Sequence, residues 1–282
     1  MALPLAGKLA IVTGASRGIG RAIAAKLGSN GANLALAYTS PSSKSLAESL
    51  SDELQSQHKI KAFPVAGDLG TPDGPKQVID AVREHFSQKG SSFQIDILIN
   101  NAGIAANNPL PKITLQDFDS SYKVNVLGPL LLTQAAEPFL PRDRSGRVVN
   151  LSSVSSSTGF IEQTVYGGTK AALEAMTRTW ARELSERATV NAVNPGPVYG
   201  EMYYKNSDEF KREIKGWIEH SPLMRARKGI DSDDLVEDAK TSGGRPGYVD
   251  EVAGVVAMLC GKDAAWVTGQ VVCANGGMIM LH

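Results

Sequence analysis

The chain has 282 residues, enough for one large α/β domain or two smaller ones. It carries 29 basic and 29 acidic residues and no basic run interleaved with aromatic side chains, so neither nucleic acid nor another polyanion is expected as a partner. Its cysteines, Cys260 and Cys273, provide neither a disulfide framework nor a metal site, and we expect buried thiols in a reducing compartment. The start of the chain lacks the pattern of a signal peptide and no apolar run is long enough to span a bilayer, so we expect a cytoplasmic protein without membrane contact.

Short apolar runs alternate with amphipathic stretches along the chain, which is the pattern of βαβ units around a parallel sheet. Strands are predicted at 9–13, 33–38, 61–65, 95–100, 146–151, 189–194 and 270–274. Helices are predicted at 18–30, 44–57, 74–88, 115–140, 165–186 and 250–260. No low-complexity linker divides the chain. We therefore expect residues 1–282 to form a single α/β domain with a doubly wound, Rossmann-like parallel sheet of about seven strands and helices on both faces.

A glycine-rich segment follows the first predicted strand and opens directly into a helix. Thr13–Gly20 reads T-G-A-S-R-G-I-G. Its glycines permit a tight turn and close approach of the backbone to a pyrophosphate, and the helix N-terminus supplies free N–H groups and positive dipole. The spacing differs from the usual G-x-G-x-x-G, so a plain βα turn is the alternative. In this position the segment predicts a dinucleotide site.

The end of the second predicted strand indicates which dinucleotide binds. An enzyme specific for NAD usually has an acidic residue there, which binds the 2′-hydroxyl of the ribose. This strand instead ends in Tyr38, Thr39 and Ser40, and two further serines and Lys44 follow. Arg17 in the glycine-rich segment adds a cation. Because a cation with hydroxyl groups suits a 2′-phosphate, NADP(H) is predicted; the alternative is that Arg17 is a plain surface charge.

Tyr166 and Lys170 are four residues apart in a predicted helix, so their side chains lie on the same face. An ammonium beside a phenol favours the phenolate. We therefore expect Lys170 to lower the pKa of Tyr166 below its usual value of about 10, so that Tyr166 exchanges a proton with a substrate near neutral pH. The same spacing also occurs by chance on exposed helices.

With these motifs in one chain, residues 7–277 resemble the classical short-chain dehydrogenase/reductase family. The motifs that carry the resemblance are Thr13–Gly20, Asp68, N-N-A-G at 100–103, Asn125, Ser153, Tyr166 with Lys170, N-P-G at 194–196, and the closing T-G-Q and G-G of 268–277. The Y-x-G-x-K form and the segment after strand two are similar to fungal-type ketoreductases, including polyhydroxynaphthalene and versicolorin reductases, and to 3-oxoacyl-carrier-protein reductases. The resemblance implies an oxidoreductase fold and a nicotinamide cofactor.

The resemblance also implies a catalytic tetrad. Ser153, thirteen residues before Tyr166, would hydrogen-bond the substrate carbonyl, with Ser152 as the rival serine. Tyr166 would donate or accept the proton, and Lys170 would hold the ribose of the nicotinamide. Asn125 would interrupt a helix and anchor a water that relays protons to Lys170; a structural helix cap is the alternative.

Cofactor contacts are implied along the carboxyl edge of the sheet. The residues assigned to the cofactor are Gly14, Ser16, Arg17, Gly18, Ile19, Gly20, Tyr38, Thr39, Ser40, Asp68, Leu69, Asn101, Ala102, Gly103, Tyr166, Lys170, Pro195, Gly196 and Val198. No metal is expected. One position departs from the family pattern, since Gly200 stands where a threonine is usual, and we expect the backbone of Val198 to contact the carboxamide instead.

Residues 197–246, called the lid segment below, form the least regular part of the chain, and we expect either a lid over the site or a solvated loop. With 104–108 and 155–163 this segment would line the substrate site. Its larger apolar side chains form either an aromatic pocket or the lid's own core: Tyr199, Met202, Tyr203, Tyr204, Trp217 and Met224. An aromatic pocket would favour a flat aromatic or polycyclic ketone of secondary metabolism.

The predicted function is an NADP(H)-dependent ketoreductase or alcohol dehydrogenase acting on a small-molecule carbonyl. We expect a homodimer or homotetramer formed through the long apolar helices. Alternatives are reduction of a C=C or C=N bond, a redox-linked cyclisation, and an NADP-binding regulator without turnover; sugar epimerases and dehydratases rank lower. The joint presence of Asn125, Ser153, Tyr166 and Lys170 favours an enzyme, because a binding protein has no need of all four.

Overall fold

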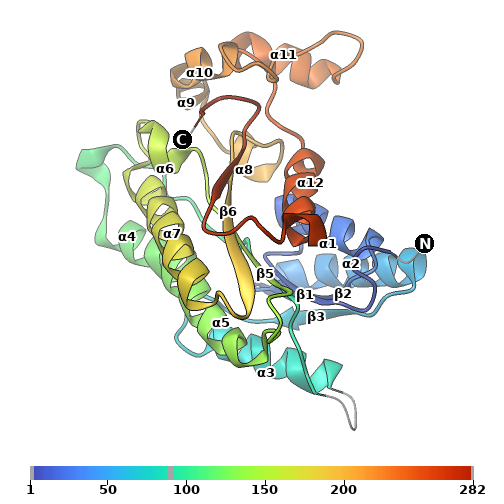
Figure 1. Cartoon of the computed structure of the whole chain (residues 1–282). Helices are drawn as coiled ribbons and strands as arrows, with labels where there is room; N and C mark the ends of the chain where they lie inside the picture. The colour runs from blue at the N-terminus through green and yellow to red at the C-terminus, as the bar shows by residue number, and fades with distance from the viewer. Residues whose placement is uncertain (1–2, 88–91, 281–282) are drawn as a thin grey trace.

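The computed structural model describes residues 3–87 and 92–280, and a seven-stranded sheet forms its centre (Figure 1). The strands are all parallel and lie in the order β3-β2-β1-β4-β5-β6-β7. Their bounds are β1 Leu9–Thr13, β2 Asn33–Tyr38, β3 Ala62–Ala66, β4 Ile97–Asn100, β5 Gly146–Leu151, β6 Ala188–Pro195 and β7 Val271–Ala274. The doubly wound fold predicted from the sequence is confirmed.

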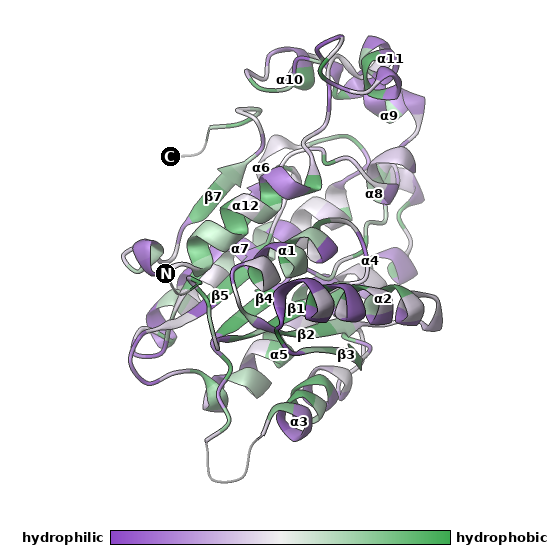
Figure 2. Ribbon diagram, turned by 90° about the vertical axis from the view of Figure 1, so that its right-hand side faces the viewer, coloured by the Kyte–Doolittle hydropathy of each residue, from purple (hydrophilic) through white to green (hydrophobic). Residues whose placement is uncertain are grey.

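Helices cover both faces of the sheet (Figure 2). On one face pack α1 (Gly18–Ser29), α2 (Pro41–His58) and α12 (Val249–Cys260); on the other pack α3 (Gly74–Phe86), α5 (Gly128–Ala136) and α7 (Thr164–Glu183). Because helices cover both sides, β1, β5 and β6 are buried along their whole length. The predicted end of the third helix, Gln88, lies outside the described residues.

Cys260 is buried as expected, whereas Cys273 is only partly buried. The difference follows from the position of Cys273 in β7, which is an edge strand of the sheet and is partly exposed along its length. Within the described ranges, no helix combines the length and apolar composition that crossing a membrane requires.

The chain reverses its direction of winding at β1, which lies between β2 and β4. In doubly wound sheets a crevice forms at this switch point, beyond the carboxyl ends of the strands. Here the side chain of Thr13 connects the two strand ends. Its Oγ1 accepts hydrogen bonds from the amides of Asn101 (2.9 Å) and Ala102 (3.0 Å), so the glycine-rich segment and the N-N-A-G segment are fixed side by side.

The long helix predicted at 115–140 is wrong as one element, because the structure breaks it near Asn125. Its parts are α4 (Leu115–Tyr122), the π-helical turn η2 (Lys123–Leu127), α5, and the 3₁₀ turn η3 (Glu137–Phe139). Pro129 has no amide hydrogen and cannot donate to the carbonyl of Asn125 four residues earlier. The amide of Gly128 donates instead to the carbonyl of Lys123, five residues back. The interruption at Asn125 that the family resemblance implied is therefore present.

The lid segment lies beyond the carboxyl edge of the sheet, at the top of Figure 1. It contains α8 (Glu201–Tyr204), α9 (Asp208–Glu213), α10 (Lys215–Glu219) and α11 (Asp233–Ser242). This segment contains an acidic stretch, residues 231–238. The stretch is not merely solvated, because Asp234 and Asp238 on α11 accept hydrogen bonds from the hydroxyls of Tyr199 (3.1 Å) and Tyr203 (2.6 Å). These contacts attach α11 to the segment that faces the sheet.

Candidate active site

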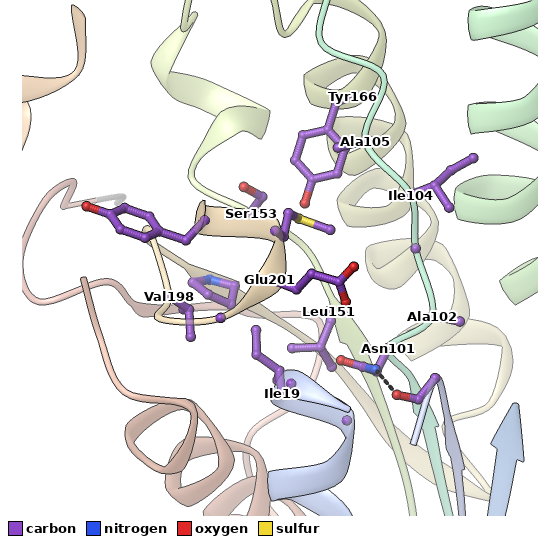
Figure 3. A pocket seen from close by; sticks show the side chains of 18 of the residues that line it. Ile19, Asn101, Ala102, Ile104, Ala105, Leu151, Ser153, Tyr166, Val198 and Glu201 are labelled. Atoms are coloured by element: carbon purple, nitrogen blue, oxygen red, sulfur yellow. Dashed lines mark hydrogen bonds between the residues drawn. The ribbon is translucent and has the colours of Figure 1, made fainter. Parts of the chain in front are cut away.

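A cleft of about 980 Å³ runs along the carboxyl edge of the sheet, between α1 and the lid segment (Figure 3). Every residue that the family resemblance assigns to the cofactor lines this cleft, and so does Ser153. Asn125 lies behind the lining and contacts it through Gly103 and Ile104. The structure therefore brings together residues that are up to 184 positions apart in the chain, from Gly14 to Val198.

The glycine-rich segment forms a cradle at the N-terminus of α1. Gly14 (φ +63°) and Gly18 (φ +55°) adopt the left-handed conformation that favours glycine. A Cβ on Gly20 would lie 2.2 Å from the carbonyl oxygen of Gly14, so no larger residue fits there. The backbone can thus approach a bound pyrophosphate closely, with the positive end of the α1 dipole behind it. This geometry fits the phosphates of a dinucleotide.

A cation and several hydroxyl groups gather at the other end of this cradle. Arg17 donates to the hydroxyl of Ser43 (3.1 Å), and Ser40 bonds to the hydroxyls of Ser42 and Ser43 at 2.9 Å each. Ser40 is the N-cap of α2 and the other two serines lie in its first turn, where the helix dipole favours an anion. The donor set fits the 2′-phosphate of NADP(H). Lys44 does not belong to it, because this side chain pairs with Glu48 and does not line the cleft.

Sequence reasoning missed Glu201, the first residue of α8. Its carboxylate accepts a hydrogen bond from the Arg17 guanidinium at 2.8 Å and pairs with Lys205 at 2.7 Å, and both cations hold its pKa below the ordinary value. Figure 3 shows this side chain projecting from the lid segment into the cleft. Arg17 is therefore shared between the glycine-rich segment and the lid, and a phosphate that binds Arg17 competes with Glu201.

The glycine at position 200 has a conformational reason. Gly200 adopts φ 154° and ψ −174°, a backbone conformation that side chains other than hydrogen strongly disfavour. A threonine at this position would be strained. The backbone around it is held by the amide of Gly247, which donates to the carbonyl of Pro197, and by the amide of Tyr199, which donates to Gly247; both distances are 2.8 Å.

Tyr166 and Lys170 face the cleft from α7, as their spacing predicted. The ammonium of Lys170 lies 5.6 Å from the centre of the Tyr166 ring and donates to the carbonyl of Leu151 at 2.7 Å. Burial lowers the pKa of Lys170 to about 8. The expected lowering of the Tyr166 pKa is wrong: burial raises the pKa of this phenol above its ordinary value, against the opposing effect of a hydrogen bond with Ser153. Tyr166 is thus protonated at neutral pH, the form that donates a proton.

The geometry favours Ser153 over Ser152 as the serine of the tetrad. The hydroxyl of Ser153 donates to the hydroxyl of Ser155 at 3.1 Å and lies close enough to Tyr166 to oppose the rise in the pKa of that phenol, so it faces the cleft beside it. The hydroxyl of Ser152 points the other way and donates to the buried carboxylate of Glu174 at 2.6 Å. A substrate oxygen can therefore reach Ser153 and Tyr166 together.

Asn125 fixes the loop after β4 against α7. Its side-chain oxygen accepts from the amide of Ile104 at 2.9 Å, and its side-chain nitrogen donates to the carbonyl of Ile104 (2.8 Å) and to the hydroxyl of Thr169 (3.1 Å). A Cβ on Gly103 would lie 3.3 Å from the Asn125 oxygen and 3.4 Å from the Lys170 nitrogen. Asn125 and Lys170 therefore both lie close to Gly103, and the side chain of Asn125 is not a helix cap.

The substrate end of the cleft contains amides and hydroxyls as well as aromatic rings. Ser155 donates to the side-chain oxygen of Gln163, which leaves the amide hydrogens of Gln163 free to act as donors. The side-chain oxygen of Asn107 is buried and has no hydrogen-bond partner among the described residues. All three residues line the cleft. It offers both donors and acceptors near Ser153.

The six large apolar residues of the lid segment divide between the two expected roles. Tyr199, Met202 and Tyr203 line the cleft. Met224 is buried in a hydrophobic cluster with Ile218, Phe210 and Ile214, of which the last two also line the cleft. Trp217 packs edge-on against Phe160, and Tyr204 bonds to Asp234. The aromatic pocket is therefore smaller than the sequence allowed.

The sheet order, the glycine cradle and the Tyr166–Lys170 pair define a nicotinamide-dependent oxidoreductase of the doubly wound class. The model of the short chain dehydrogenase family matches residues 8–210, and the chain belongs to this family. L-xylulose reductase of Aspergillus niger is 50% identical over 298 aligned positions, with 99% of each chain covered. L-xylo-3-hexulose reductase of Hypocrea jecorina is 48% identical over 99% of each chain.

A solved structure gives the same result for the fold and the cofactor. The angucycline C-6 ketoreductase LanV, solved with bound NADP, superimposes with a TM-score of 0.82 at 31% identity, covering 98% of this chain and 96% of that one. The family predicted from the sequence and the prediction of an oxidoreductase are confirmed. The prediction of NADP(H) as the cofactor is confirmed by neighbours solved with bound NADP or NADPH.

Proposed function

We propose that this enzyme uses NADPH to reduce the carbonyl of an open-chain ketose to the corresponding polyol. The observation that carries the proposal is the set of polar groups at the substrate end of the cleft, where Ser155 and Gln163 are linked to Ser153 by hydrogen bonds and Asn107 lines the same cleft. Sugar hydroxyls both donate and accept hydrogen bonds, and this end of the cleft offers both kinds of partner. The names of the two ketose reductases above agree with it.

The side-chain amide of Gln163 is oriented to donate a hydrogen bond to a substrate hydroxyl. The hydroxyl of Ser155 occupies its oxygen, so its N–H groups are left to donate to a substrate hydroxyl. The backbone amide of Asn108 donates to the carbonyl of Glu162 at 3.0 Å, which holds the loop of Asn107 next to Gln163. The unpaired oxygen of Asn107 is then available to accept from a second hydroxyl. A substrate without hydroxyls would leave the buried oxygen of Asn107 unpaired, which costs binding free energy.

The proton chemistry follows from the tetrad. Ser153 donates a hydrogen bond to the carbonyl oxygen and Tyr166 donates the proton to it, because burial keeps the phenol protonated at neutral pH. Lys170 uses one N–H for the carbonyl of Leu151, which leaves two for the ribose hydroxyls of the cofactor. Asn125 keeps Lys170 and the loop of Gly103 in register.

The cofactor residues divide by the part of NADPH that they would hold. The glycine cradle of 14–20 would bind the pyrophosphate, and Arg17 with the serines of α2 would bind the 2′-phosphate. Asp68 and Leu69 would flank the adenine, while Asn101–Gly103 and Pro195–Val198 would line the nicotinamide end. NADPH supplies the hydride when bound, and the protein supplies orientation and the proton.

Reduction of an aromatic ketone is the second candidate. Tyr199, Tyr203 and Phe160 line the cleft, and LanV, named for an angucycline substrate, shares the fold. Aromatic rings in the cleft favour a flat substrate, whereas the amide pair favours a hydroxylated one. The two candidates differ in which carbonyl the enzyme reduces faster.

The test compares carbonyls in one assay of NADPH oxidation. L-xylulose, a bicyclic aromatic ketone and butanedione serve as the hydroxylated, aromatic and small unsubstituted probes. We expect kcat/KM for L-xylulose to exceed the other two at least about tenfold, and Tyr166→Phe to lower kcat by ~10²–10⁴-fold while NADPH still binds. Faster turnover of the aromatic ketone contradicts the ketose assignment. Full turnover by Tyr166→Phe contradicts the assignment of the proton donor.

We also propose, from the sequence and the family, that residues 1–282 act as one catalytic domain in a cytoplasmic homodimer or homotetramer, with 197–246 as its lid. Exposed apolar side chains on α4, Leu115 and Phe118, support a surface between copies.

A further inference from the structure

Glu174 is a buried carboxylate on α7 that the proton chemistry above does not use. It lies four residues after Lys170 and is 9% exposed. Burying a carboxylate costs free energy unless hydrogen-bond donors surround it. The hydrogen-bond partners of Glu174 must therefore offset the cost of burying its carboxylate, and they also indicate its role.

Three uncharged donors converge on a single oxygen of Glu174. Oε1 accepts from the hydroxyl of Ser152 (2.6 Å), the hydroxyl of Ser156 (2.7 Å) and the side-chain amide of Asn194 (3.3 Å). The amide of Asn194 also lies 3.3 Å from the hydroxyl of Ser156. The donors come from the residue after β5, from α6 (Ser155–Thr158) and from β6, so one carboxylate connects three separate elements to α7.

Each donor is next to a residue of the cleft. Ser152 directly precedes Ser153, and Asn194 directly precedes the Pro195–Gly196 turn at the nicotinamide end. Ser156 belongs to α6, whose first residue bonds to both Ser153 and Gln163. Hydrogen bonds to a carboxylate are shorter and roughly twice as strong as neutral ones. The carboxylate of Glu174 therefore fixes both the segment of Ser153 and the Pro195–Gly196 turn, from the side that faces away from the cleft.

We propose that Glu174 is a positioning residue for carbonyl reduction. It sets the hydroxyl of Ser153 and the Pro195–Gly196 turn relative to Tyr166 and Lys170, which share its helix. The inference rests on the roles proposed above for Ser153 and Tyr166, and it holds for whichever carbonyl the enzyme reduces. A displacement of ~1 Å at such a site can cost ~10²-fold in rate, so the expected effect is on kcat.

Glu174→Gln tests the proposal, because glutamine keeps the size and removes the charge. We expect kcat to fall ~10- to 100-fold with whichever probe the wild type reduces best, while KM and the NADPH Kd, followed by nicotinamide fluorescence, each change less than about threefold. Thr177→Val is the matched control, since Thr177 is buried on the next turn of α7 and accepts a hydrogen bond from Asn150 away from the cleft. It should lower Tm and leave kcat within about twofold.

A double-mutant cycle with Ser152→Ala tests the route. If Glu174 acts through Ser152, the second substitution adds little to the loss in kcat that Glu174→Gln already causes. The proposal is overturned if kcat of Glu174→Gln stays within about twofold of wild type, or if Thr177→Val lowers kcat equally. It is also overturned if the losses in kcat from Glu174→Gln and Ser152→Ala are fully additive. If Glu174→Gln does not fold, Ser152→Ala and Ser156→Ala each remove one donor, and unchanged kcat in both overturns it. Full turnover by Tyr166→Phe instead contradicts the proposed role of Tyr166 as proton donor, and this result is distinguishable because it does not involve Glu174.

Discussion

Replacing Lys170 by methionine removes a buried ammonium whose cost to the fold depends on pH. Burial lowers the pKa of this side chain from 10.5 to about 8 in the folded chain. The unfolded chain, with the side chain in water, keeps the ordinary value. Between these two values the unfolded state binds more protons than the folded one, so the contribution of Lys170 to stability rises as pH rises through this window.

The magnitude follows from the two pKa values. The ammonium form destabilises the fold by roughly 3 kcal/mol at pH well below 8, and this penalty disappears above 10.5. Between pH 7 and pH 9 the wild type should gain about 1 kcal/mol of stability relative to Lys170→Met. Lys170 is 4% exposed, so solvent screening does not reduce this difference.

Urea unfolding of the wild type and Lys170→Met at pH 7 and pH 9 measures the difference directly. Lys262→Met, at an exposed position, controls for the general loss of one positive charge. The compared quantity is the free energy of unfolding of the wild type minus that of Lys170→Met. If this difference stays constant between the two pH values, or falls toward pH 9, the reasoning is refuted. In reduction assays, Lys170→Met should also lower kcat, because the ribose of NADPH loses its two remaining donors.

Four further variants test the cofactor end and the assembly. Arg17→Ala should raise the NADPH Kd ~10- to 100-fold and leave the NADH Kd unchanged; equal weakening of both would contradict a role at the 2′-phosphate. Glu201→Gln should lower the NADPH Kd, because the guanidinium is released for the phosphate, and an unchanged Kd by fluorescence titration would count against this competition. Gly20→Ala places a Cβ 2.2 Å from the carbonyl oxygen of Gly14, so NADPH binding should be lost in calorimetry; retained binding contradicts the cradle geometry. Phe118→Glu should shift the protein to monomer in light scattering if α4 forms the interface, and an unchanged mass excludes that face.

Local patterns determined most of what the sequence could predict. The strand bounds at β1, β2 and β5 agree with the prediction, because apolar runs covered on both faces leave little choice of register. The cofactor site could be predicted from the glycine-rich segment and the strand end at Tyr38, because binding of a pyrophosphate and a 2′-phosphate requires particular residue types at short spacing. The Tyr166–Lys170 pair was readable because both side chains lie on one helical face.

The tertiary structure decided what depends on contacts between distant segments. Whether burial or the neighbouring cation controls the pKa of Tyr166 depends on how deeply α7 packs, and burial wins. Glu201 reaches Arg17 across 184 positions of the chain, and no pattern in the sequence predicts a contact at that separation.

The helix predicted over 115–140 shows the same division between sequence and structure. Its apolar period marked a helix, but the missing amide of Pro129 and the close packing of Gly103 against Asn125 and Lys170 decided where it opens. The sequence by itself determined the family, the fold and the cofactor, because these depend on residue types at short spacing. The folded chain decided the ionisation of Tyr166, the partner of Arg17 and the polar end of the cleft, because burial and contact exist only once the chain has packed.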